Sequence, residues 1–271
     1  MLDVRDLTVR YGARTVVDRA SFSVAGGQWL MLLGPNGAGK STILSAISQG
    51  APYSGSVSVC GLDARIVRPA ALARRLGVLM QSHAVGYAFT VEEVVRLGRY
   101  AYAKGALSGR SAEDDAAVER ALAETGLTAL SGRSVLQLSG GELQRTFLAQ
   151  LFAQNPSVLL LDEPTNNLDL VYQKQVFSQL SAWLQTPGRA IVSVVHDLSL
   201  ALAYGTHALL LKGGVTVAYG AIGDVLTEEN LARAYDMDVY AWMRMQLSQW
   251  ETKREEPNHG LWPMEQRDSA D

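Results

Sequence analysis

The chain has 271 residues, of which 48% are hydrophobic and 19% are charged. This composition supplies enough apolar material for a packed core and argues against a disordered chain or a coiled coil. Lysine and arginine total 24 against 27 aspartate and glutamate residues, and this balance lacks the basic excess that accompanies nucleic-acid binding. We therefore expect no nucleic-acid partner. The single cysteine, Cys60, cannot form an internal disulfide, which favours a reducing compartment.

Strands are predicted over the first part of the chain. Short alternating segments lead to the continuous apolar run Trp29–Leu33, which is typical of a buried parallel strand. A helix is predicted from Lys40 to about Gln49, and residues 53–80 read as short strands and turns with one helix near Ala70–Leu76. All apolar runs are far shorter than the roughly 18 residues of a membrane-spanning helix, so we expect any work at a membrane to be done through a partner.

The pattern then becomes helical and later alternates between strands and helices. Predicted helices cover Val91–Arg99, Ser111–Gly126 and Ser139–Asn155, followed by strands at Val158–Leu161, Ala190–Val195, Ala208–Leu211 and Val215–Ala218, with a helix at Leu170–Leu184. This order predicts an α/β chain with a mostly parallel sheet core (1–80 and 156–250) that is interrupted by a helical subdomain (81–155). Residues 251–271 read as a polar C-terminal tail.

A phosphate-binding loop is predicted between the strand Trp29–Leu33 and the helix after it. Residues 34–42 match the pattern G-x-x-x-x-G-K-[ST], in which backbone N–H groups and a helix N-terminus converge on phosphate oxygens. Lys40 is expected to reach the β- and γ-phosphates, and the Ser41 hydroxyl to bind Mg²⁺. A glycine-rich turn without a ligand is the alternative. The candidate nucleotide contacts here are Gly34, Asn36, Gly37, Ala38, Gly39, Lys40, Ser41 and Thr42.

Two carboxylates follow the apolar run Val158–Leu161. They lie at the carboxyl end of a predicted core strand, where ligands bind in sheets of this kind. Asp162 is suited to bind Mg²⁺, and Glu163 to orient and deprotonate an attacking water. The alternative is an acidic loop at the surface. The presence of a phosphate-binding loop in the same chain argues against this alternative.

A third motif, Leu138-Ser139-Gly140-Gly141-Glu142, precedes these carboxylates. Ser139 and Glu142 have the spacing of a capping box that begins a helix, and this reading is compatible with anion binding because a glycine-rich helix N-terminus attracts negative charge. With this motif in place, the chain resembles the ATP-binding cassette (ABC) ATPases over about residues 1–240. The resemblance implies a P-loop ABC ATPase fold, with a RecA-like, mostly parallel sheet core, an N-terminal antiparallel β subdomain and a helical insertion.

The resemblance also implies a homodimer that binds and hydrolyses ATP with Mg²⁺. In this family the turn corresponding to Ser139, Gly140 and Gly141 faces the γ-phosphate bound on the other subunit, so that each chain holds two half-sites. Tyr11 matches the aromatic residue that stacks on adenine, although composition alone leaves a plain edge-strand tyrosine as an equal alternative.

Three further positions take their predicted roles from the same resemblance. Gln81 matches the glutamine that binds Mg²⁺ and senses the γ-phosphate. His196 matches the histidine that contacts the γ-phosphate and the catalytic carboxylate. Asn167 stands where the family usually has a small residue, in the loop that crosses the dimer interface.

A single cassette without spanning helices is similar to the importer type, which docks on separate transmembrane permease subunits. Four stretches resemble the cassettes of iron-siderophore, haem and vitamin B12 uptake: Phe89–Arg99, Asn167–Leu170, His196–Leu202 and Leu226–Tyr235. The resemblance implies a peripheral protein at the cytoplasmic face of the inner membrane, which meets a substrate-binding protein only through the permease. A soluble, non-transport ABC ATPase that acts as a regulator or assembly factor is the alternative.

Overall fold

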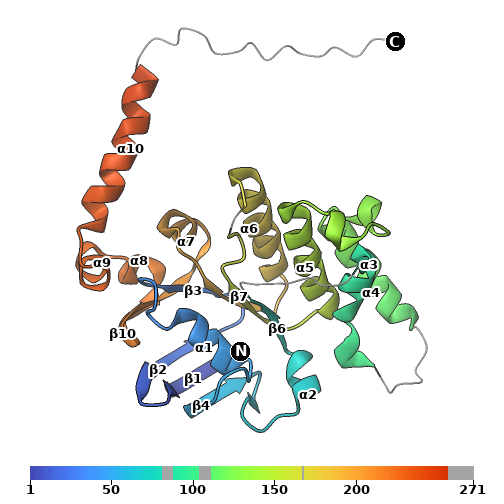
Figure 1. Cartoon of the computed structure of the whole chain (residues 1–271). Coiled ribbons are helices and arrows are strands. Elements are labelled where there is room, and N and C mark those ends of the chain that lie inside the picture. Colours follow the sequence, from blue (N-terminus) through green and yellow to red (C-terminus); the bar gives the residue numbers. More distant parts are fainter. Residues whose placement is uncertain (81–87, 104–110, 167, 256–271) are drawn as a thin grey trace.

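The computed structural model describes residues 1–80, 88–103, 111–166 and 168–255. Two predicted positions, Gln81 and Asn167, lie outside the described residues, as does most of the expected tail. The described chain forms two sheets with helices packed around them (Figure 1).

The first sheet is antiparallel and confirms the predicted N-terminal β subdomain. Its strand order is β2-β1-β4-β5, with β1 at Leu2–Tyr11, β2 at Arg14–Val24, β4 at Ser54–Val59 and β5 at Leu62–Asp63. Gly12 has a φ of 58°, a conformation that suits the tight turn between β1 and β2. In β1 the side chains of Leu2 and Val4 are buried while Asp3 between them is not, as expected for a strand that covers a core with one face.

The second sheet has six strands in the order β10-β9-β3-β8-β7-β6. The strands are β3 at Trp29–Leu33, β6 at Leu76–Leu79, β7 at Val158–Asp162, β8 at Ala190–Val194, β9 at His207–Lys212 and β10 at Val215–Ala221. Only the edge pair β9–β10 is antiparallel. Every residue of β3, β7 and β8 is buried, which explains their continuous apolar sequences and confirms the predicted mostly parallel core.

Alternate side chains of this sheet enter two separate cores. Leu30 and Leu32 face the helix α1 (Lys40–Ile47) and the antiparallel sheet, whereas Trp29 and Met31 face the opposite core. Trp29 stacks on Phe177 at 5.4 Å between ring centroids, and its indole N–H donates to Ser193 Oγ at 2.8 Å. The sheet is therefore covered on both faces.

Three helices between β6 and β7 pack against one another: α3 (Val91–Leu97), α4 (Ala112–Glu124) and α5 (Gly140–Gln154). They match the predicted helices, and α5 is capped at its C-terminus by Asn155, which has a φ of 50° and precedes Pro156. The remaining helices are α2 (Pro69–Ala73), α6 (Leu170–Leu184), α7 (Leu198–Tyr204), α8 (Ile222–Val225), α9 (Glu228–Tyr235) and α10 (Val239–Glu255). The domain boundaries predicted from the sequence stay predictions, although α3, α4 and α5 all fall within 81–155.

Two details differ from the sequence-based expectation. The helix expected near Ala70–Leu76 ends at Ala73, because Leu76 already begins strand β6. Helix α10 runs to Glu255 and so includes the first residues of the expected tail; it stands away from the rest of the molecule in Figure 1. Within the described ranges, no helix is both long enough and apolar enough to cross a membrane.

Helices α3 and α5 approach closely at Gly98, and this contact yields a testable prediction. A Cβ on Gly98 would collide with the carbonyl oxygen of Gln150 and lie 3.0 Å from the amide nitrogen of Gln154. We expect Gly98→Ala to cost about 1–3 kcal/mol through overpacking, and so to lower the Tm by about 2–12 °C in thermal unfolding. Gly132→Ala is the matched control, because a Cβ there meets no described atom within 4 Å. Equal Tm values for the two variants would contradict this packing argument.

Candidate active site

The phosphate-binding loop joins β3 to α1 and depends on glycine at defined positions. Gly34, Gly37 and Gly39 have φ values of 137°, 77° and 97°, which residues with a side chain rarely adopt. A Cβ on Gly39 would lie 2.8 Å from the carbonyl oxygen of Val16, and one on Gly34 would collide with the carbonyl oxygen of Leu211. The loop is therefore confined by backbone from both sheets.

Lys40, the first residue of α1, is buried at the base of the loop. Its ammonium group donates to the carbonyl oxygens of Gly34 at 2.7 Å and Pro35 at 2.9 Å. Burial lowers the pKa of Lys40, and the charges of Glu163 and Asp162 partly oppose that effect. The buried ammonium group of Lys40 therefore lies within electrostatic reach of both carboxylates.

Ser41 and Asp162 meet at the carboxyl end of β7. The serine hydroxyl donates to Asp162 Oδ1 at 3.0 Å. Burial raises the pKa of this carboxyl group, and the hydrogen bond from Ser41 counteracts that rise. Mg²⁺ prefers oxygen ligands, and the hydroxyl and the carboxylate supply two of them side by side. Phosphate oxygens and waters would complete the coordination shell, so these residues fit the metal. The third expected ligand, Gln81, is outside the described residues.

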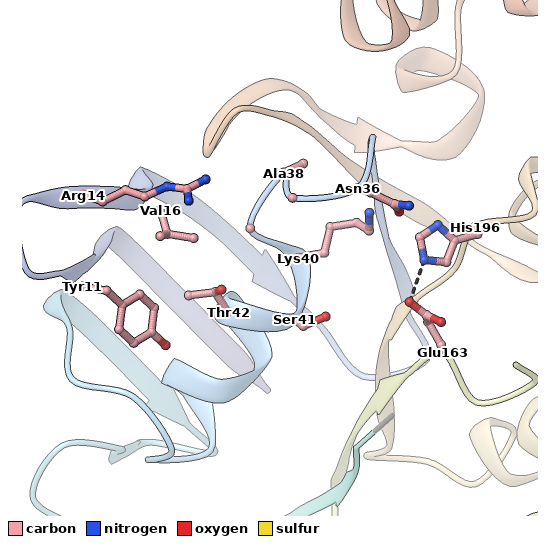
Figure 2. A pocket seen from close by; sticks show the side chains of 12 residues that line it. Tyr11, Arg14, Val16, Asn36, Ala38, Lys40, Ser41, Thr42, Glu163 and His196 are labelled. Atoms are coloured by element: carbon pink, nitrogen blue, oxygen red, sulfur yellow. Dashed lines mark hydrogen bonds and ion pairs between the residues drawn. The ribbon is translucent and has the colours of Figure 1, made fainter. Parts of the chain in front are cut away.

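Glu163 directly follows β7 and His196 lies two residues after β8, a neighbouring parallel strand, and the two side chains point toward each other (Figure 2). His196 Nε2 lies 2.6 Å from Glu163 Oε1, and Asn166 Nδ2 donates to the other carboxylate oxygen at 2.9 Å. Glu163 has a φ of 51°, a left-handed conformation that is unusual for a residue with a side chain and is typical of functional sites. The two predicted catalytic residues are therefore in direct contact.

One cleft of about 670 Å³ collects most of the predicted nucleotide contacts. Its lining is Tyr11, Arg14, Val16, Asn36, Gly37, Ala38, Gly39, Lys40, Ser41, Thr42, Glu163 and His196. Tyr11 lies at the end opposite His196 in Figure 2 and is exposed, so its ring is available for stacking.

Arg14 and Val16 were not predicted from the sequence. Both lie on β2: the register Tyr11↔Arg14 places the arginine directly across the turn from Tyr11, at the same end of the cleft, and Val16 follows two residues later. The sequence signal for them is the turn at Tyr11-Gly12 itself, since a tight hairpin places the residues after the turn beside those before it.

Ser139, Gly140 and Gly141 do not line this cleft. Ser139 caps α5: its backbone N–H donates to Glu142 Oε2 at 2.8 Å, and its hydroxyl accepts from the backbone N–H of Glu142 at 3.3 Å. The hydrogen bond from the Ser139 backbone N–H to the carboxylate is the largest cause that lowers the pKa of Glu142, and the Ser139 side chain adds to it. Ser139 and Gly140 are exposed, whereas Gly141 is buried against the ring of Tyr172. The turn is thus free to meet a group that its own chain does not supply.

A family model described as ABC transporter matches residues 17–166, more than half of the chain. The chain belongs to the ABC transporter family. This result confirms the family resemblance, and members with this domain are ATP-binding subunits that hydrolyse ATP. We refer to the chain below as the cassette.

Curated relatives and solved structures agree with this membership. The cassette is 41% identical over 240 residues to the hemin import ATP-binding protein HmuV of Thermobifida fusca, covering 88% of the cassette and 83% of that protein. It is 36% identical to the ferric enterobactin transport ATP-binding protein FepC of Escherichia coli, with 85% of each chain covered. An inward-facing structure described as a metal-chelate type ABC transporter has a TM-score of 0.76 at 27% identity, covering 88% of the cassette and 89% of that chain.

Removing the charge of the buried carboxylate Asp162 should stabilise the fold and, at the same time, weaken the binding of Mg²⁺. Because its pKa is raised, the folded chain binds this proton more tightly than the unfolded chain does, so stability gained through Asp162 increases as the pH falls through the folded pKa. At pH 7 the ionised carboxylate lowers the free energy of unfolding. We expect Asp162→Asn to raise the Tm of the nucleotide-free cassette at pH 7, by about 2–4 °C for each kcal/mol recovered. The same variant should lose the additional rise in Tm that Mg²⁺ gives in the presence of ATP.

Asp114→Asn is the matched control. Asp114 accepts from Arg99 Nε at 2.7 Å, and the side chain of Arg99 is only 8% exposed. Removing that charge leaves a buried guanidinium without its carboxylate partner, so this variant should lower the Tm. A lower Tm for Asp162→Asn as well would contradict the assignment of Asp162 as a destabilising buried charge.

Proposed function

We propose that the cassette is the ATP-hydrolysing subunit of an importer that takes up an iron-siderophore, haem or cobalamin-like metal chelate. The observation that carries the enzymatic part is the convergence of Lys40, Ser41, Glu163 and His196 on one cleft that ends at Tyr11. The substrate class is supported by the relatives named for hemin and ferric enterobactin, and by a cobalamin import relative from Halobacterium salinarum that is 37% identical.

ATP binding would use the cleft from end to end. Tyr11 stacks on the adenine, Arg14 supplies positive charge beside it, and the backbone N–H groups of Gly37–Ser41 receive the phosphates. Lys40 exchanges the carbonyl oxygens of Gly34 and Pro35 for phosphate oxygens. Ser41 and Asp162 would hold Mg²⁺, with Gln81 as a further ligand; the metal, when bound, neutralises charge on the β- and γ-phosphates.

Hydrolysis would be the work of Glu163 and His196. The Glu163 carboxylate takes a proton from the attacking water, whose oxygen forms the new bond to the γ-phosphorus as the bond to the β-phosphate oxygen breaks. His196, 2.6 Å from Glu163 Oε1, orients that carboxylate and contacts the γ-phosphate. Asn166 fixes the other carboxylate oxygen. The products are ADP and inorganic phosphate.

A second copy would complete the site. The exposed turn at Ser139 and Gly140 would cap the γ-phosphate held by the other copy, so that two ATP molecules lie between two head-to-tail cassettes. ATP then favours the closed dimer by its greater affinity for that state, and hydrolysis reopens it. Closure would be transmitted to separate transmembrane permease subunits at the cytoplasmic face of the inner membrane, with the cassette as a peripheral subunit and a substrate-binding protein acting on the far side.

The composite site is tested with Glu163→Gln. Removal of the catalytic base should lower ATP turnover by about 10²–10⁴-fold and leave ATP binding intact, so that light scattering detects an ATP-dependent dimer. Adding Ser139→Arg to this variant should abolish the dimer, because a long cationic side chain then occupies the space for the partner's phosphate, while monomers still bind ATP.

Ser111→Arg in the Glu163→Gln background is the matched control. Ser111 is also an exposed helix cap, since its hydroxyl accepts from the backbone N–H of Glu113 at 3.3 Å at the start of α4. We expect this double variant to dimerise with ATP as Glu163→Gln does. A dimer that tolerates Ser139→Arg, or one that both arginine substitutions abolish, would contradict the composite site.

The substrate class is tested by uptake in the source organism. Deletion of the gene should lower the uptake of radiolabelled ferric siderophore, haem or cobalamin at least tenfold for one of the three, and the wild-type gene should restore it. The gene carrying Glu163→Gln should not. Normal uptake of all three chelates in the deletion strain would overturn the importer proposal and favour a non-transport ATPase.

A further inference from the structure

The amide hydrogen of Gly34, the first residue of the phosphate-binding loop, is bonded to a side chain from the far end of the sequence. Strand β3 pairs with β9 through the pair Leu33↔Leu210. One residue later, the Gly34 N–H donates to the phenol oxygen of Tyr235 at 3.2 Å. Tyr235 therefore meets the loop at the point where the sheet ends.

Tyr235 is itself held in place from β9. It is the last residue of α9, is half-buried, and packs against the core on the side of Trp29 and Met31. Lys212, the last residue of β9, donates to the carbonyl oxygen of Arg233 at 2.8 Å and forms an ion pair with Asp236 at 2.6 Å. The end of α9 is thus tied to the strand that neighbours β3, which fixes the phenol relative to the sheet.

Gly34 also connects Tyr235 to Lys40, the residue predicted to contact the β- and γ-phosphates. Gly34 donates its N–H to Tyr235 and presents its carbonyl oxygen to Lys40 Nζ at 2.7 Å. Burial raises the pKa of Tyr235, so the group that accepts the hydrogen bond is a neutral hydroxyl. A second tie holds the other end of the loop, where the backbone N–H of Gly214 donates to the carbonyl oxygen of Ala38 at 3.2 Å.

We propose that Tyr235 is a positioning residue of the ATP site: its phenol oxygen fixes the amide of Gly34 and so holds the phosphate-binding loop in the geometry that receives a triphosphate. Tyr235 lies outside the cleft lining and acts through Gly34. The inference rests on the proposed ATP site. The loop binds by aiming several backbone N–H groups at one anion, so preorganisation of its base contributes directly to affinity.

The test is Tyr235→Phe in the full-length chain. This substitution removes one oxygen and keeps the ring, so the core packing is retained while the Gly34 N–H loses its partner. We expect the Kd for ATP, measured by isothermal titration with Mg²⁺, to rise by roughly 3- to 10-fold, in line with the usual weight of one hydrogen bond. Turnover at saturating ATP should stay within about twofold of wild type, since Glu163 and His196 are untouched.

Tyr219→Phe is the matched control. The hydroxyl of Tyr219 also accepts from a backbone N–H, that of Ser23 at 3.1 Å, and donates to the carbonyl oxygen of Ser23 at 2.6 Å, but it does not line the cleft. This variant loses hydrogen bonds of the same kind away from the loop, so its Kd for ATP should equal that of wild type even if its Tm falls.

The outcomes separate the two proposals. A raised Kd in Tyr235→Phe alone supports the positioning role. An unchanged Kd in Tyr235→Phe, or an equal rise in both variants, would overturn it. A wild-type chain that binds no ATP would instead contradict the proposed function, whatever the tyrosine variants do.

Discussion

Close approach of backbone atoms to the phosphate-binding loop is the constraint on which the site depends. Gly39 lies against the carbonyl group of Val16 in the antiparallel sheet, and Gly34 against that of Leu211 in the six-stranded sheet. Gly214 joins the two sides, because its N–H donates to Ala38 and its carbonyl oxygen accepts from Asp18. Neither sheet alone can shape the loop. The antiparallel subdomain is therefore part of the nucleotide site as well as a cover for the core.

The ionisable groups of the site have hydrogen-bond partners within the chain. Lys40 is bound to two carbonyl oxygens, Asp162 to Ser41, and Glu163 to His196 and Asn166. Such pairing limits the cost of burying charge in the cleft. It also means that ATP must exchange partners rather than meet free groups, so the affinity is a difference between two well-bonded states.

The parts of the fold that could be predicted from the sequence are those with a local signal. Continuous apolar runs identify the core strands, and glycine spacing identifies the loop between β3 and α1. The contact between Glu163 and His196 was expected from the family resemblance, and the structure explains it because the two residues follow neighbouring parallel strands. Arg14 was missed although the tight turn at Tyr11-Gly12 signals it, because its place in the cleft also requires the register of the hairpin. Tyr235 could not be assigned from a local signal, because its contact depends on the docking of α9, which long-range packing decides.

The capping box predicted at Ser139 is confirmed, and it leaves part of the turn exposed. The capping box is present, yet it satisfies only the backbone N–H groups of Ser139 and Glu142. Gly140 between them is exposed, its φ is not in the left-handed region, and a Cβ there would meet no described atom within 4 Å. Nothing in its own described surroundings therefore requires glycine at this position. The exposed helix N-terminus at Ser139 and Gly140 is therefore open to an anionic group from outside the chain, which is the basis of the proposed contact with a second copy.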